Sequence, residues 1–469
     1  MTWTETKPGI WQRPIGENER FIKLIGDRGH QAGREHWSVT AGASFALNKT
    51  LTPTELSAKC REAWCRLRFE HPSIACTADD EEGKLTYHVA SAESLAAWAN
   101  ESFSVHERSS VDDVIASFKP SQYTTAHLLP AVHAGNPQIL IHSAHWRTDG
   151  FGALQLIDSF LDSLCKAIIY NNFPIPVLAW GQEPARLAPG IEEVLSLPIE
   201  PTPDIISAAQ DYLKTVAHTR NAAGVSLTPG TESSLPAGTR SAALRLSPAV
   251  TSGIRSACDS NSISLLSAVH AACAALTLES CPPSAPARPY TSTIRLSLRP
   301  HLPEPYRNNP AYAAAIYTGG YMFPVPADTA FLEACKLYEA EYRRGVTPEL
   351  LKSRREYAIQ VFNNLQGQAA SKANPSPPAP VQSEVDISSV GNAEELVKVS
   401  RTCGHVALGV DDVVIGVETL TRQTYCFVYE FQGRLGLRIV YNEAFYTHER
   451  VEGMVKRLGE ILVSGLGLE

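Results

Sequence analysis

The chain of 469 residues is longer than one compact core usually holds, which predicts two or three domain-sized units. Its hydrophobic fraction of 44% and charged fraction of 19% are typical of a folded enzyme and exclude wholesale disorder. A net charge of −8, with no basic run that interleaves aromatic residues, excludes a nucleic-acid-binding function.

The ten cysteines occur singly, and none forms a CxxC pair. This pattern argues against a zinc site and favours a reducing compartment, so we expect no bound metal. The N-terminal segment lacks a basic region followed by an apolar one, and no run of about 18 apolar residues occurs in the chain. We therefore expect a cytoplasmic protein with no secretory signal and no membrane span.

The first half of the chain alternates strand-like and helix-like patterns. A strand is predicted at residues 37–47, and Thr52-Pro53 opens a helix with apolar residues at helical spacing. Further strands are predicted at 72–78, 84–90 and 138–145. From Phe151 the apolar residues recur every three or four positions, which predicts a long amphipathic helix.

A passage rich in Gly, Ser, Thr and Pro follows, and we place an inter-lobe linker at residues 216–240. The remaining chain again mixes the two patterns. Strands are predicted at 241–247, 290–300, 317–326, 424–431 and 434–442, and helices at 262–279, 328–345 and 448–465. The sequence thus predicts two similarly built α/β lobes, residues 1–215 and 241–469.

The segment richest in chemistry is HSAHWRTDG, residues 142–150, where a predicted strand gives way to a helix. His145 can accept a proton from an attacking hydroxyl near neutral pH. Asp149 can cap the helix or hold an arginine, and Gly150 allows a tight turn. On residue types alone, such a histidine is more often structural, and His142 is a rival base.

Taken together, His145-x-x-x-Asp149-Gly150 resembles the HxxxDG signature. That signature belongs to the superfamily of chloramphenicol acetyltransferase, plant BAHD acyltransferases, alcohol acetyltransferases and peptide-synthetase condensation domains. Other segments resemble the same fold in the same order: 52–75, 262–278, 293–305, 387–391, 433–435 and 441–442. The layout is most similar to fungal enzymes of the trichothecene 15-O-acetyltransferase type. Ala144 departs from the paired histidines of condensation domains, and the DFGWG segment of BAHD enzymes is not recognisable.

The resemblance implies a fold of two chloramphenicol-acetyltransferase-like lobes, each a mixed sheet with flanking helices, and a solvent channel between them. It implies an acyltransferase that moves an acyl group, here an acetyl group, from an acyl-CoA to a hydroxyl of a lipophilic secondary metabolite. A hydroxyl acceptor is favoured over an amine. His145 acts as general base, and no covalent enzyme intermediate forms.

The other site residues follow from the same resemblance. Asp149 and Gly150 support the active site, with Arg295 as the expected partner of Asp149 and Arg299 in reserve. Trp146, Tyr321 and Ser388 are candidates for the channel or the acceptor pocket.

Acetyl-CoA, or another acyl-CoA, is expected as co-substrate rather than as a bound cofactor. Two alternatives stay open: an acyl donor carried by an acyl carrier protein, and a non-catalytic binding scaffold of the same fold. We expect a monomer, because one chain carries both lobes. The sequence does not identify the acceptor.

Overall fold

The computed structural model describes residues 2–130, 135–169, 178–232, 234–282, 286–370 and 382–468. The chain divides into two compact units of three segments each. Unit 1 comprises Met1–Leu197, Arg299–Tyr317 and Ala393–Val417; unit 2 comprises Pro198–Leu298, Thr318–Asn392 and Glu418–Glu469. The units differ from the consecutive segments 1–215, 216–240 and 241–469 predicted above, because two late strands join the main sheet of unit 1.

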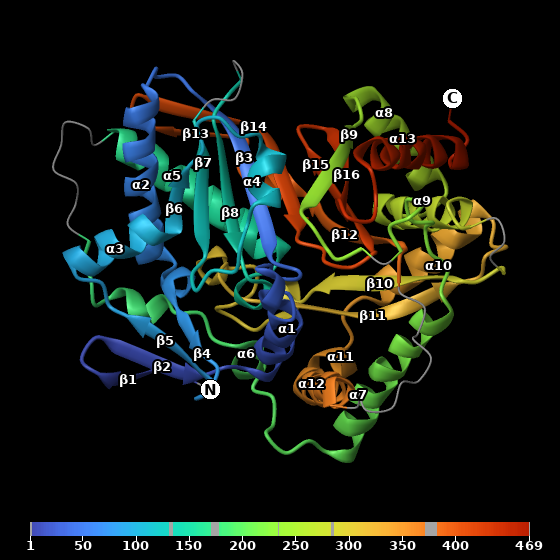
Figure 1. Ribbon diagram of the computed structural model, residues 1–469, viewed down its shortest axis with the longest axis horizontal. Coiled ribbons are helices and arrows are strands. Elements are labelled where there is room, and N and C mark those ends of the chain that lie inside the picture. Colours follow the sequence, from blue (N-terminus) through green and yellow to red (C-terminus); the bar gives the residue numbers. More distant parts are fainter. Residues whose placement is uncertain are drawn as a thin grey trace. The chain divides into compact units, whose positions relative to one another are not determined.

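Unit 1 is built around a six-stranded sheet in the order β13-β14-β3-β8-β7-β6 (Figure 1). Its strands are β13 (Ser400–Cys403), β14 (Val406–Val417), β3 (Val39–Leu47), β8 (Gln138–Ser143), β7 (Thr125–Leu129) and β6 (Phe103–Val105). The β6–β7 pair is parallel and the other neighbours are antiparallel. Pairing of β14 with β3 makes residues 393–417 part of this unit.

Two long helices, α2 (Pro53–Glu70) and α5 (Gly150–Ile169), pack against each other, and α5 also lies against β3, β8 and β14. The start of α2 is fixed by a reciprocal cap, since the Thr52 hydroxyl accepts from the amide of Glu55 and the Glu55 carboxylate accepts from the amide of Thr52. The predicted amphipathic pattern of α5 is confirmed: its apolar face, including Leu154, Ile157 and Leu161, is fully buried.

The rest of unit 1 includes a second sheet and several short helices. The sheet has the order β1-β2-β5-β4. Its strands are β1 (Thr4–Lys7), β2 (Ile10–Pro14), β5 (Lys84–His88) and β4 (Thr77–Asp79). The helices are α1 (Glu17–Asp27), α3 (Ala92–Ser102), α4 (Val111–Ala116) and α6 (Ile191–Val194). The prediction of a strand over 72–78 is wrong in its first half. Residues Pro72–Ala75 form a 3-10 turn, because Pro72 has no amide hydrogen for a strand ladder.

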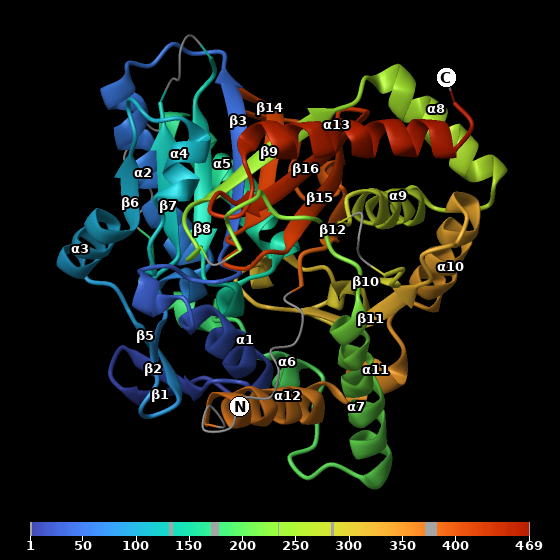
Figure 2. The same ribbon diagram turned by 45° about the vertical axis from the view of Figure 1, so that its right-hand side comes forward.

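Unit 2 contains a four-stranded sheet, β12-β15-β16-β9, and a two-stranded sheet, β10-β11. The strands are β9 (Thr239–Arg245), β10 (Tyr290–Ser297), β11 (Thr318–Val325), β12 (Val385–Asn392), β15 (Thr424–Phe431) and β16 (Arg434–Asn442). The helices are α7 (Pro203–Thr215), α8 (Pro248–Ser260), α9 (Leu265–Glu279), α10 (Phe331–Arg344), α11 (Pro348–Lys352), α12 (Arg354–Ala370) and α13 (His448–Gly465). Helix α9 packs against α10 and α13 in the core of this unit (Figure 2).

The predicted strands 424–431 and 434–442 and the predicted helix 448–465 are confirmed at both ends. Each is bounded by a local signal. The tight turn Gln432-Gly433, with both residues at positive φ, joins the two strands, and the Thr447 hydroxyl caps the helix. The mixture of strands and helices in both units agrees with the predicted α/β class.

In the described part of the chain, no single helix combines the length and apolarity of a membrane span. Helices α8 and α9 pass that test only as a pair, and the chain bends by 99° between them.

Candidate active site

The HxxxDG segment lies in unit 1, between the end of β8 at Ser143 and the start of α5 at Gly150. Residues His145–Arg147 form one 3-10 turn, η3. Arg147 is buried, and its guanidinium donates to the carbonyl oxygens of Cys76 and Gln122. These two bonds tie the turn to neighbouring backbone, so the histidine stands on a fixed loop.

The imidazole of His145 is half-buried, and its Nδ1 lies 3.0 Å from the carbonyl oxygen of Thr148. A carbonyl oxygen can only accept a hydrogen bond, so Nδ1 must carry the hydrogen. In the neutral ring the other nitrogen, Nε2, then holds the lone pair that can take a proton. The turn therefore selects the neutral tautomer that has its lone pair on Nε2.

The rival base, His142, lies in the core of the sheet. Its side chain stacks on Phe118, with ring centroids 4.0 Å apart, and its Nδ1 lies 2.9 Å from the Thr40 hydroxyl. Burial, with a smaller contribution from the Arg34 charge, lowers the pKa of His142 to about 3. A buried imidazole of such low pKa is a poor proton acceptor at neutral pH, which favours His145.

Asp149 is buried, with 4% of its surface exposed, and its carboxylate accepts hydrogen bonds from three residues. The amides of Gly152 and Tyr317 donate at 2.8 and 2.9 Å, and Arg299 donates through Nη2 at 3.1 Å and through Nε at 3.2 Å. The Gly152 bond caps the first turn of α5. Asp149 thus joins the site helix to the segment 299–317.

The expected pairing of Asp149 with Arg295 is wrong, and the reserve candidate Arg299 takes that place. Arg295 lies in unit 2, where its guanidinium donates to Asp386 at 2.8 Å and to the carbonyl oxygen of Ile387 at 2.6 Å. The expectation assumed one regular strand through both arginines. Strand β10 ends at Ser297 and Arg299 begins a 3-10 turn, so strand alternation does not extend to Arg299.

Two small residues near the site play different parts. Gly150 is the first residue of α5. The close approach occurs at Gly152, where an added Cβ would lie 2.0 Å from the carbonyl oxygen of Ala313 and 2.6 Å from the Thr148 hydroxyl. The sequence did not point to Gly152, nor to the hydrogen bond that the Tyr317 amide donates to Asp149. The glycine two residues after Asp149-Gly150 was the available signal for the first, and nothing local signalled the second.

The three candidates for the channel or acceptor pocket lie in different places. Trp146 is buried among Ile15, Leu85 and Ala144 in unit 1. Tyr321, in β11 of unit 2, is also buried and donates its hydroxyl to Glu341 at 2.7 Å. Ser388 is half-buried in β12, also in unit 2. Their part in a pocket stays a prediction, as does the channel.

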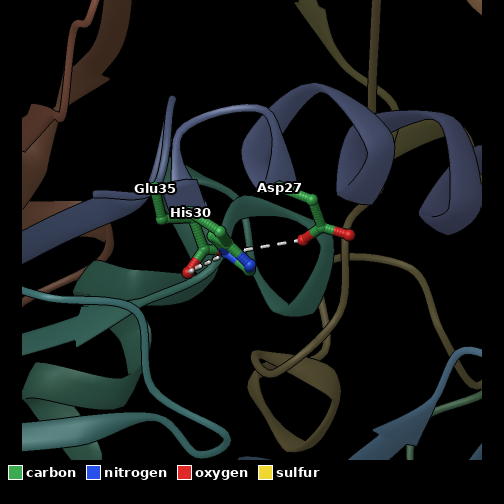
Figure 3. Close-up of side chains that lie close together, drawn as sticks. All are labelled: Asp27, His30 and Glu35. Atoms are coloured by element: carbon green, nitrogen blue, oxygen red, sulfur yellow. Dashed lines mark ion pairs between the residues drawn. The ribbon is translucent and has the colours of Figure 1, made fainter. Parts of the chain in front are cut away.

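One group of described side chains has the composition of a metal site. Atoms of Asp27, His30 and Glu35 all lie within 4.8 Å of one another, near the end of α1 (Figure 3). His30 Nε2 is 3.5 Å from Asp27 Oδ1 and 3.9 Å from Glu35 Oε2. Lys23 lies 2.6 Å from the second oxygen of Asp27 and competes with a cation there. The group contains no HxxxDG residue, and the expectation of a metal-free enzyme stays a prediction.

No family model matches the chain, but individual known proteins are similar to it. The chain is 47% identical to acetyltransferase pigO of Monascus ruber over 470 residues, covering 100% of this chain and 99% of that protein. It is 28% identical to O-acetyltransferase pigM of the same organism over 471 residues, covering 100% and 88%.

Among solved structures, the chain is similar to TRI3 trichothecene 15-O-acetyltransferase from Fusarium sporotrichioides. The TM-score is 0.81 at 20% identity, over 99% of this chain and 98% of that one. At this identity the likeness shows the fold alone, and it confirms the predicted α/β class with chloramphenicol-acetyltransferase-like halves.

Proposed function

We propose a specific reaction for this chain, which belongs to the family of fungal acetyltransferases that includes pigO of Monascus ruber. The protein transfers an acetyl group from acetyl-CoA to a hydroxyl of a lipophilic secondary metabolite. Two similar proteins, O-acetyltransferase pigM and TRI3 trichothecene 15-O-acetyltransferase, are named for transfer to oxygen, which supports a hydroxyl acceptor. The coenzyme A donor and the acceptor class are parts of this proposal.

The observation that carries the proposal is the 3.0 Å contact between His145 Nδ1 and the carbonyl oxygen of Thr148. It leaves the lone pair on Nε2, the nitrogen that a hydroxyl proton would reach. A placed general base of this kind accelerates proton transfer by about 10²–10⁴-fold.

The proposed reaction needs no covalent enzyme intermediate. Nε2 of His145 takes the proton of the acceptor hydroxyl as the oxygen attacks the thioester carbonyl. The tetrahedral oxyanion then collapses, the carbon–sulfur bond breaks, and the departing thiolate of coenzyme A recovers the proton from the imidazolium. Asp149 takes no part in proton transfer. Its three donors, Gly152, Tyr317 and Arg299, support a structural role in holding the loop.

The proposal has two alternatives and also covers the state and location of the enzyme. A carrier-protein donor and a non-catalytic scaffold are the alternatives that the experiment below separates from the acyl-CoA reaction. We also propose a monomeric enzyme in the cytoplasm, acting on a small-molecule alcohol without a bound metal or cofactor.

The first test is calorimetric binding of acetyl-CoA to the purified protein, together with release of free thiol, with and without a panel of hydroxylated fungal metabolites. We expect binding, slow thiol release with water as acceptor, and faster release with a suitable alcohol. His145→Ala should bind acetyl-CoA normally and lose about 10²–10⁴-fold in turnover. His405→Ala is the matched control, because His405 is exposed and lies outside the HxxxDG segment.

The outcomes separate the alternatives. Thiol release that is unchanged in His145→Ala removes His145 from the role of base. No binding of acetyl-CoA by a folded protein points to a carrier-protein donor, which acetyl loaded on a carrier protein would reveal. If the folded protein transfers acetyl from neither acetyl-CoA nor the loaded carrier protein, the non-catalytic scaffold is the remaining alternative.

A further inference from the structure

The two shortest hydrogen bonds of Thr148 run in opposite directions. Its carbonyl oxygen accepts from His145 Nδ1, and its hydroxyl donates to the carbonyl oxygen of Ala313 at 2.9 Å. A longer contact of 3.3 Å links the same hydroxyl to the carbonyl oxygen of Asp149. The residue is buried, with 1% of its surface exposed, and its backbone is extended. The peptide that orients the imidazole is therefore itself anchored by a side chain.

The Ala313 carbonyl oxygen, which accepts from the Thr148 hydroxyl, also accepts a hydrogen bond from Arg299. Arg299 Nη2 donates to the carbonyl oxygens of Ala313 at 3.3 Å and Ala315 at 2.9 Å, while Nη1 donates to that of Tyr312 at 3.2 Å. One buried guanidinium thus binds three carbonyl groups of the segment 310–317.

Gly152 closes the arrangement from the side of α5. An added Cβ there would lie 2.0 Å from the Ala313 carbonyl oxygen and 2.6 Å from the Thr148 hydroxyl, so the three groups are in close packing contact. A residue with a Cβ at this position would displace the Ala313 carbonyl oxygen or the Thr148 hydroxyl, so glycine allows both groups to lie this close to α5.

We infer that Thr148 is a positioning residue for His145. Its hydroxyl is held by the Ala313 carbonyl oxygen and thereby fixes the Thr148 peptide. The carbonyl oxygen of that peptide orients the imidazole and selects its tautomer. This inference rests on the proposed function of His145. The polar chain runs from Arg299 through Ala313 and Thr148 to His145, and it begins at the same guanidinium that pairs with Asp149. A small displacement of a catalytic group costs rate rather than substrate affinity, so the residue should act on kcat.

The test compares Thr148→Val, which removes the hydroxyl and keeps the shape, with Thr148→Ser, which keeps the hydroxyl. Thr124→Val is the control, because Thr124 is equally buried in unit 1 and bonds to the Ser143 hydroxyl instead. We expect Thr148→Val to lose about tenfold in kcat with little change in KM, a smaller effect than removal of the base itself. Thr148→Ser should recover most of the rate, and Thr124→Val should not reduce it.

A second readout does not depend on turnover. In protein labelled with ¹⁵N-histidine, the His145 signals, assigned by their loss in His145→Ala, report which ring nitrogen is protonated. We expect the Nδ1–H form in the wild type and in Thr148→Ser, and a mixture of the two tautomers in Thr148→Val. Thr148→Cys, with a weakly donating thiol, replaces Thr148→Val if that variant does not fold.

The outcomes are separable. A wild-type tautomer and rate in folded Thr148→Val overturn the inference and leave the proposed function intact. An inactive wild type defeats the proposed function, and the tautomer measurement then still decides whether Thr148 holds the ring.

Discussion

Two arginine–aspartate pairs of the described chain have arginines that stand four residues apart. The turn pair, Arg299–Asp149, lies in unit 1 with a shortest contact of 3.1 Å, and the strand pair, Arg295–Asp386, lies in unit 2 with 2.8 Å. Both side chains of the turn pair are almost inaccessible, at 3% and 5% exposure, whereas Arg295 is 29% exposed. The residue types are the same, but the surroundings differ.

The difference lies in what else each carboxylate binds. Asp149 also accepts from the amides of Gly152 and Tyr317, and so it fixes the start of α5 beside His145. Asp386 accepts from its own neighbour Ile387 and from Thr293, which links β12 to β10. The same type of ion pair therefore holds the turn of the HxxxDG segment in one place and joins two strands in the other.

The largest expected difference is in the loss of stability when the arginine of each pair is removed. Arg299→Ala should lower the free energy of unfolding by about 3–5 kcal/mol, because it leaves a buried carboxylate without its cation. Arg295→Ala should cost roughly 1–2 kcal/mol, since water can reach the partly exposed site. Urea denaturation of both variants measures these losses, and acetyl transfer should fall much further in Arg299→Ala. Equal losses of stability and activity would contradict the distinction between the pairs.

The next difference is in the pH dependence of stability, because a second carboxyl group, that of Glu384, lies near the strand pair. Burial and the neighbouring charge of Asp386 raise the pKa of Glu384 to about 8 from an ordinary 4.5. Between these pH values the folded chain binds a proton that the unfolded chain has released. The contribution of Glu384 to the free energy of unfolding is therefore greatest below about pH 4.5 and is lost as the pH rises to about 8.

Glu384→Gln tests this, since the amide keeps the shape without the proton equilibrium. We expect the variant to gain about 2–4 kcal/mol relative to the wild type between pH 5 and pH 9, measured by urea denaturation across that range. A difference between Glu384→Gln and wild type that stays constant with pH would refute the raised pKa.

The smallest difference concerns two glycines. Gly152→Ala places a Cβ 2.0 Å from a backbone oxygen in unit 1, whereas Gly319→Ala, in β11 of unit 2, meets its nearest atom at 3.5 Å. Overpacking of this kind costs about 1–3 kcal/mol, so thermal unfolding should detect the first change and hardly detect the second. Gly152→Ala should also slow acetyl transfer. A wild-type melting temperature for Gly152→Ala would show that the contact with Ala313 is loose.

Much of this protein was predictable from local patterns. The spacing of apolar residues after Phe151 predicted α5, and the Thr52-Pro53 signal predicted the start of α2. The strand-like runs TYCFVYEF and RLGLRIVYN predicted β15 and β16. The HxxxDG motif located His145 and Asp149 because both lie within one strand–turn–helix segment, which a short stretch of sequence describes in full. The partner of Asp149 lies 150 residues away and was assigned to the wrong arginine.

The sequence by itself determined the α/β class, the positions of most helices and strands, and the pair His145 and Asp149, because each depends on residues within about one helix or strand length. Only the tertiary structure decided that β14 joins the sheet of unit 1, that Arg299 rather than Arg295 holds Asp149, and that Ala313 meets Thr148 and Gly152. Those contacts join segments far apart in the chain, and their geometry depends on where β10 ends and how the following turn packs, which no local pattern encodes.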